Sequence, residues 1–298
     1  MAYEDGAGGG LDYFAYRFGR SRLLFRGPRP KIDGGYVAIL GGTETYGKYV
    51  AAPFPALLGE RLGLPVVNFG CMHAGVNVFV DDDSVLAACG EADLTVIQVM
   101  GAANMSNRLY TVHPRRNDRF LKASPALRAL YPHLDFTEFN FTRHLLAALE
   151  GHAPDAFAAV RNELRDAWLG RMRMLVRKIG GRVVLLWMSN RGPGQGADRA
   201  LSADPLFVDR ALIEALRADV SDIVEVVASD PARAAGLDGK VFAPMEAPAA
   251  MEVPGPLFHR EVADALAVCL AAHLKRERPG DRVAGPRVEL AEGVRAFR

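Results

Sequence analysis

The sequence predicts a three-layer α/β protein built on a parallel sheet of five strands. Five short apolar runs alternate with segments of helical periodicity, and almost every run ends in a loop rich in Gly, Asn or Thr. Unbroken runs of Val, Ile and Leu are typical of strands that helices cover on both faces. Right-handed crossovers then favour the strand order 2-1-3-4-5. The runs are residues 37–40, 65–69, 94–100, 182–188 and 222–227.

Length and composition indicate one large domain and limit its partners. The chain has 298 residues, of which 50% are hydrophobic, and no linker or repeat divides it. A formal net charge of +1 argues against nucleic acid or an acidic membrane as a partner. The three cysteines are too scattered for a disulfide framework or a zinc knuckle, and no residues indicate a metal or cofactor. No secretory signal or membrane-spanning run is visible, which predicts a cytoplasmic protein.

We divide the chain into an arm, a domain and a tail. Residues 1–35 form the arm, residues 36–277 form a single α/β domain with an insertion at about 102–150, and residues 278–298 form a polar tail. The arm mixes aromatic residues with Arg, so we expect it to pack across the domain or onto a second copy in a homodimer. Binding of nucleic acid is the alternative, which the balanced charge disfavours. The tail could add a short edge strand at 287–290.

The first strand leads into the segment around which the chain is organised. Gly41 and Gly42 allow a sharp turn, and Thr43 then presents a hydroxyl at the carboxyl end of a central strand. Open α/β sheets place their binding sites at this edge. The alternative is an ordinary turn in which Thr43 caps the next helix. Pro55 and Gly63 bound a helix over 54–62.

Further helices follow the later strands. The acidic run 81–83 predicts a helix cap rather than a metal site, because consecutive residues point in different directions. Apolar residues at helical spacing predict helices at 155–179, 205–218 and 261–274. The insertion after the third strand is expected to be helical and to wall the substrate site. Three arginines in it, Arg115, Arg116 and Arg119, could clamp an anion or form ion pairs with Asp118, Asp135 and Glu138.

The loops after the first three strands resemble the conserved blocks of the SGNH, or GDSL-like, hydrolases of bacteria. In the first block, Gly41 to Gly47 follows the frame Gly-Asp-Ser-x-Thr-x-Gly, with Thr43 at the nucleophile and Gly42 at the Asp. The second block supplies a Gly donor to the oxyanion, for which Gly70 and Gly75 are candidates. In the same block, His73 lies close to the position where the family often has its Gly. In the third block, Gly101 matches the expected Gly, and Asn104 lies one residue beyond the expected Asn.

The same resemblance assigns a base to the last helix. The family carries Asp-x-x-His before its final helix, and here His259 stands at the His and Pro256 at the Asp. Glu246 or Glu252 could orient the imidazole instead. The alternative is that His259 is a helix cap or a core residue.

The resemblance implies an ester hydrolase or acyltransferase. Thr43 would attack a carbonyl, His259 would accept its proton, and Asn104 with backbone N–H groups would stabilise the oxyanion. Because of the arginines, we expect a small-molecule or glycan-linked substrate with anionic character. The alternative is a domain of this fold that binds or transfers another group, as in polysaccharide modification, without hydrolysis.

Overall fold

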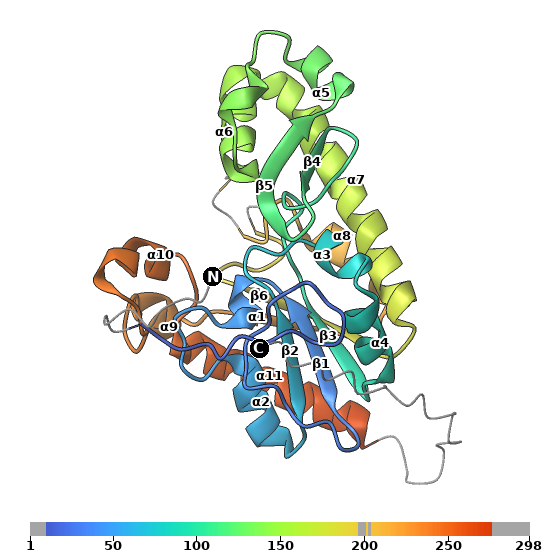
Figure 1. The fold of residues 1–298 in the computed structure, drawn as a ribbon, viewed down its shortest axis with the longest axis vertical. Coiled ribbons are helices and arrows are strands. Elements are labelled where there is room, and N and C mark those ends of the chain that lie inside the picture. Colours follow the sequence, from blue (N-terminus) through green and yellow to red (C-terminus); the bar gives the residue numbers. More distant parts are fainter. Residues whose placement is uncertain (1–9, 196–200, 202–203, 276–298) are drawn as a thin grey trace, which may run out of the picture.

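The computed structural model describes residues 10–195, 201 and 204–275 (Figure 1). The expected tail with its edge strand lies outside these residues. The strands are β1 (Val37–Gly41), β2 (Val66–Gly70), β3 (Leu94–Gln98), β4 (Tyr110–His113), β5 (Arg116–Ala123), β6 (Val183–Ser189) and β7 (Asp222–Val227). The α-helices are α1 (Thr43–Tyr46), α2 (Phe54–Leu62), α3 (Asn77–Val80), α4 (Asp83–Glu91), α5 (Pro125–Leu130), α6 (Thr142–His152), α7 (Pro154–Ile179), α8 (Arg210–Glu214), α9 (Asp230–Ala234), α10 (Ala247–Met251) and α11 (Pro256–Leu274).

Five parallel strands form the central sheet in the order β2-β1-β3-β6-β7. This confirms the predicted order 2-1-3-4-5, because β4 and β5 pair with each other in a separate antiparallel sheet. All five apolar runs named from the sequence became the strands of the central sheet. Their carboxyl ends meet at one edge, where Thr43 follows β1 directly.

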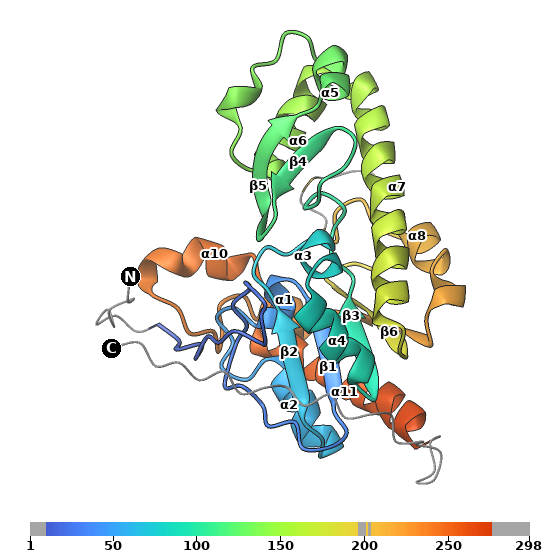
Figure 2. The same ribbon diagram turned by 45° about the vertical axis from the view of Figure 1, so that its right-hand side comes forward.

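Alternating side chains of each strand fill two hydrophobic layers. In β1, Val37 and Ile39 join the layer under α2 and α11, while Ala38 and Leu40 join the layer under α3, α4 and α7. Figures 1 and 2 show α2 and α11 together on one side of the sheet and α4 and α7 on the other. The protein therefore has the predicted three-layer architecture.

The insertion after β3 contains a β-hairpin as well as the expected helices. Tyr110 and Val112 of β4 are buried, and Thr111 between them is exposed, a period of two that favours a strand. Figure 1 shows β4, β5, α5 and α6 beyond the end of the parallel sheet, with α7 running from them down to α4. The insertion thus stands over the edge that carries Thr43.

Two helix boundaries differ from the prediction. The helix expected at 205–218 is shorter at both ends, because α8 begins only at Arg210 and ends at Glu214, and a 3-10 turn follows at Arg217–Asp219. The last helix begins at Pro256 rather than at 261, since Pro is favoured in a first helical turn. The predicted acidic cap is confirmed: Asp82 accepts a hydrogen bond from the N–H of Val85 at the start of α4.

Within the N-terminal arm, residues 10–35 pack across their own domain. Phe18 and Phe25 each meet the ring of Phe69 in β2 edge to face, with centroids 5.1 Å apart. Ser21 donates a hydrogen bond to Asp82 beside α4. No helix within the described ranges is long and apolar enough to cross a membrane.

Candidate functional site

Thr43 lies at the turn between β1 and α1, where the sequence predicted it. Gly42 is the N-cap, and Thr43 is the first residue of the helix rather than its cap. Glycine is required at Gly41, since a Cβ there would lie 2.0 Å from the hydroxyl of Thr45. The Thr43 side chain is partly exposed, and its Oγ1 accepts a hydrogen bond from the backbone N–H of His73 at 3.0 Å.

His73 brings the loop after β2 to Thr43. Its φ of +58° is in the left-handed region, which Gly adopts more easily than other residues. This conformation accounts for the Gly that the resemblance expects near this position. The backbone N–H points at the Thr43 hydroxyl, and the imidazole is exposed. His73 therefore contributes a backbone donor to Thr43.

Gln98, the last residue of β3, holds this turn in position. It is 3% exposed, and its Oε1 accepts hydrogen bonds from the N–H groups of Gly42 at 3.0 Å and Thr45 at 3.2 Å. Its Nε2 donates to the carboxylate of Glu44 at 2.8 Å. We did not name Gln98 from the sequence, although a polar residue inside an apolar strand was the available signal.

Glu44 supplies a carboxyl group with a perturbed pKa beside Thr43. The residue keeps some exposed surface, yet desolvation of its carboxyl raises the pKa above the ordinary value, and the charge of Asp204 adds to this. The hydrogen bond from Gln98 and the charge of His73 act in the opposite direction. Perturbed carboxyls gather at functional sites. We did not select Glu44 from the sequence; its position next to Thr43 was the only signal.

Asn104 carries an amide donor on the loop after β3. Its Oδ1 accepts a hydrogen bond from the hydroxyl of Thr142 at 2.7 Å, which turns the amide so that Nδ2 is a donor with no partner among residues that the structure describes. Gly75 packs against this loop, since a Cβ on it would lie 1.6 Å from the carbonyl oxygen of Asn104. Asn104 therefore contacts the loop after β2 at Gly75, two residues after His73 in the sequence.

Gly42, Gly70 and Gly75 use their N–H groups in hydrogen bonds that hold the loops together. The N–H of Gly70 donates to Asn68, and the N–H of Gly75 donates to Asn117 of the hairpin. Gly70 lies against the backbone of α1, and Gly101 lies against Leu206. The candidate donors to an oxyanion are thus the side chain of Asn104 and the backbone N–H groups of Gly101 and Thr43, because the N–H of His73 already donates to Thr43.

His259 is placed among core residues by the first turn of α11. It is 1% exposed, and its ring stacks on Phe54 with centroids 5.9 Å apart. Its Nδ1 accepts the backbone N–H of Phe54 at 3.1 Å, so the neutral ring carries its proton on Nε2. Burial, with smaller contributions from the charges of Arg26 and Lys240, lowers the pKa of His259 to about 3.

These contacts differ from those that a catalytic base needs. A base must offer a ring nitrogen without a proton to the hydroxyl, and the nitrogen that is free of a proton in His259 is engaged by Phe54. No hydrogen bond joins His259 to Thr43 in the described part of the chain. Glu246, a candidate for orienting His259, instead binds Lys48 and Tyr49. The pair of Thr43 and His259 stays a prediction, and the geometry favours the core alternative for His259.

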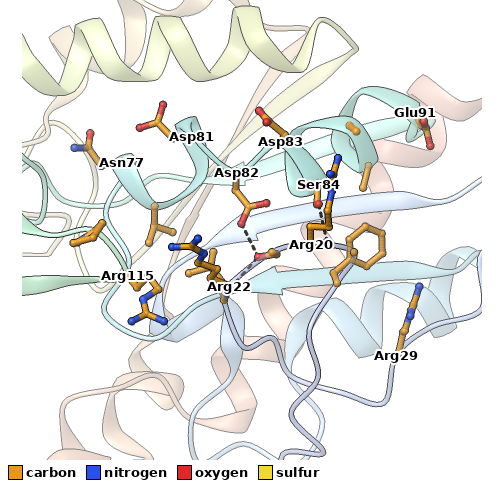
Figure 3. Close-up of a pocket in the computed structure, with 18 of the residues that line it drawn as sticks. Arg20, Arg22, Arg29, Asn77, Asp81, Asp82, Asp83, Ser84, Glu91 and Arg115 are labelled. Carbon is orange, nitrogen blue, oxygen red and sulfur yellow. Dashed lines mark hydrogen bonds between the residues drawn. The ribbon is translucent and has the colours of Figure 1, made fainter. Parts of the chain in front are cut away.

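The three arginines of the hairpin point to different neighbours. Arg116 lies 3.7 Å from Asp118, and Arg119 stacks over the ring of Phe141 at 4.1 Å. Arg115 borders a groove of about 2000 Å³ between the N-terminal arm, α4 and the hairpin. Figure 3 shows Arg115 and Arg22 in this groove, below Asp81. The hairpin also contacts the loop after β2, because its Asn117 accepts a hydrogen bond from the N–H of Gly75.

The fold and the residues around Thr43 define a three-layer α/β/α protein that presents a hydroxyl and a perturbed carboxyl at the carboxyl edge of its sheet. A family model described as a domain of unknown function, DUF6473, matches residues 1–274, so the chain belongs to this family. No curated protein matches the chain.

Solved structures with a similar fold are described as GDSL- or SGNH-type proteins. A lipolytic protein from Desulfitobacterium hafniense is 13% identical, with a TM-score of 0.39 over 78% of this chain and 99% of its own. A GDSL-like lipase from Bacteroides ovatus is 13% identical, with a TM-score of 0.42 over 81% of this chain and 54% of its own. An SGNH hydrolase from Slackia heliotrinireducens is 15% identical, with a TM-score of 0.37 over 80% of this chain and 100% of its own. Similarity at this level does not assign an activity.

Proposed function

We propose that this protein is an ester hydrolase or acyltransferase that acts at the carboxyl edge of the sheet, around Thr43. The observation that carries the proposal is the hydroxyl of Thr43, which is partly exposed and held by the N–H of His73 at 3.0 Å. The carboxyl of raised pKa on Glu44 adjoins it in sequence. A hydroxyl, a titratable carboxyl and an amide donor are the groups that acyl transfer requires.

In the proposed reaction, Oγ1 of Thr43 attacks the carbonyl carbon of an ester and its proton passes to Glu44 or His73. The alcohol of the ester leaves with a proton, and the acyl group stays on Thr43. Water or an acceptor hydroxyl then releases the acyl group by the reverse proton movements. The free Nδ2 of Asn104 stabilises the oxyanion in both steps. Burial raises the pKa of Glu44, so its carboxylate is a stronger base than an ordinary one.

For the substrate we propose an ester with an anionic or carbohydrate-linked part. Arg115 supports this choice, because it is exposed on the hairpin and forms no ion pair with Asp118, unlike Arg116. The same hairpin contacts the loop after β2 through Asn117. An anionic extension of the substrate bound at Thr43 would therefore meet the Arg115 guanidinium on this hairpin.

Hydrolysis of p-nitrophenyl esters with acyl chains of different lengths tests the proposal. We expect Thr43→Ala to abolish the reaction and Thr43→Ser to retain it, since Ser keeps the hydroxyl and removes the crowding methyl group. Asn104→Ala should lower kcat by about 10²-fold to 10³-fold, the cost of one oxyanion donor. Glu44→Gln should lower it by about 10²-fold or more. Thr111→Ala, at an exposed threonine of the hairpin, is the matched control.

A second candidate function is binding or transfer of another group without ester hydrolysis. It is favoured by one observation: no side-chain base hydrogen-bonds to the hydroxyl of Thr43 within the described ranges. Full activity in Thr43→Ala, or no turnover of any ester by wild type, would reject the hydrolase proposal. Stabilisation of wild type by an acidic oligosaccharide, lost in Asn104→Ala, would then support the second candidate.

A further inference from the structure

A cluster of side chains of the types that ligate metals lies away from Thr43, between β7 and α11. Asp222 is the first residue of β7, at the opposite end of that strand from the carboxyl edge of the sheet. Cys269 and His273 are four residues apart in α11, so both face the same side of the helix. One ligand atom from each of the three residues lies within 4.8 Å of the other two.

The two distances from Asp222 to the other ligand atoms agree with those around a tetrahedral metal ion. With bonds of about 2.0 Å to nitrogen or oxygen and about 2.3 Å to sulfur, tetrahedral angles place nitrogen and oxygen about 3.3 Å apart and sulfur and oxygen about 3.5 Å apart. Here Nε2 of His273 lies 3.1 Å from Oδ2 of Asp222, and Sγ of Cys269 lies 3.5 Å from the same oxygen.

Surrounding contacts orient the cluster and leave it accessible. The other oxygen of Asp222 accepts the N–H of Ile223 at 2.8 Å, which turns Oδ2 toward Cys269 and His273. The His273 side chain is 14% exposed and that of Asp222 is 42% exposed, so an ion and a water molecule can reach the site. Arg182 approaches the backbone oxygen of His273.

We propose that Asp222, Cys269 and His273 bind one divalent transition-metal ion, with Zn²⁺ as the preferred ion and water as the fourth ligand. A thiolate, a carboxylate and a neutral imidazole balance the charge of Zn²⁺, and this ligand type suits zinc. On binding, the thiol releases its proton to solvent, and the imidazole proton moves from Nε2 to Nδ1. The ion would fasten the last helix to the edge strand, independently of the chemistry at Thr43.

Titration of chelator-treated protein with Zn²⁺ and with Co²⁺ tests the site. We expect one ion per chain, absorption from a cobalt–thiolate bond, and a rise in Tm of about 5 °C when free Zn²⁺ exceeds Kd about a hundredfold. Cys269→Ser and His273→Gln should each weaken binding at least about tenfold, since even outer-shell changes have that effect. Cys89→Ala removes a thiol from the opposite face of the sheet and should leave binding unchanged.

Alkylation of the wild-type protein provides a test that needs no variant. Bound Zn²⁺ should slow the reaction of Cys269 with iodoacetamide at least about tenfold, because a coordinated thiolate is held by the metal. A chelator should restore the rate, and mass spectrometry identifies the modified cysteine. If Zn²⁺ does not protect Cys269, or binds equally well to Cys269→Ser, the three side chains form a hydrogen-bonded cluster only and the proposal is wrong.

Discussion

Thr43 owes its presentation to hydrogen bonds made by a residue fifty-five positions further along the chain. Gln98 receives the N–H groups that follow β1 and donates to Glu44, so one buried amide sets both the turn and the carboxyl. A buried amide that lost these partners would be costly, which restrains the turn. The reactivity of Thr43 therefore depends on β3 as well as on its own loop.

His259 shows how one side chain can satisfy a motif by position and a different role by contact. Its Nδ1 accepts a hydrogen bond from the N–H of Phe54, which has no intrahelical partner at the start of α2, and its ring packs on the Phe54 ring. The ring must stay neutral to do so, because protonation of Nδ1 would remove the acceptor. This requirement leads to a pH dependence that substitution can isolate.

We predict that His259→Asn folds and loses part of the acid sensitivity of wild type. Asn can offer its Oδ1 to Phe54 in place of Nδ1. In wild type the folded-state pKa of His259 is about 3 and its ordinary value is 6.5. The unfolded chain therefore binds a proton that the folded chain does not, and stability falls as pH drops below 6.5. Between pH 7 and pH 5 this amounts to about 2 kcal/mol, at about 1.4 kcal/mol per pH unit.

Urea unfolding at both pH values measures the difference. Carboxyl groups such as Glu44 contribute equally to wild type and to His259→Asn, so they cancel in the comparison. An identical loss of stability in the two proteins would mean that His259 titrates normally. The same variant also tests catalysis: if ester hydrolysis is lost while stability is kept, the base predicted from the motif is His259 after all.

At the scale of elements, the site depends on how closely the loops after β2 and β3 approach each other. Gly75 makes that approach possible, because its missing side chain leaves room for the backbone of Asn104. The hairpin reinforces the contact through Asn117, which is fully buried. The first residue of α6, Thr142, then orients the amide of Asn104. Two parts of the insertion thus support one small stretch of backbone.

We predict that Gly75→Ala destabilises the protein by about 3 kcal/mol and lowers activity, because the new Cβ would lie 1.6 Å from a backbone oxygen. Gly170→Ala is the matched control. Gly170 lies inside α7 with nothing within 4 Å of an added Cβ, so alanine there should stabilise by about 0.8 kcal/mol. The free energy of unfolding in urea distinguishes the two changes. Equal effects in the two variants would show that the loops are not tightly packed.

At the scale of the whole molecule, the sequence predicted the sheet better than the site. Each strand of the central sheet is a local apolar run, so its place could be inferred from neighbouring residues alone. The hairpin was missed because its alternation is short and interrupted by the turn at Pro114. The residues that support Thr43 were only partly predicted. Gln98 binds Gly42 and Thr142 binds Asn104 through long-range hydrogen bonds, which leave no local pattern in the sequence.

The hydrophobic core also shows that the insertion is not a separate unit. One continuous cluster contains Leu40 and Ile97 of the sheet together with Leu145 and Tyr110 of the insertion. The helix α7 joins the two regions, and the indole of Trp168 on it donates to the carbonyl of Met100 just after β3 at 2.8 Å. Side chains that share one core lose their packing together.

We therefore predict that the insertion and the sheet unfold in one cooperative transition. Native-state hydrogen exchange should give amides of α6 an opening free energy within about 1 kcal/mol of those of β3, because both open only with the shared core. Amides of α9, which buries no side chain, should exchange at much lower free energy and serve as the control for local opening. If α6 instead opens several kcal/mol below β3, the insertion unfolds on its own. Thr142 would then release Asn104 before the sheet is lost, and activity would disappear at lower urea concentrations than the fluorescence of buried Trp187.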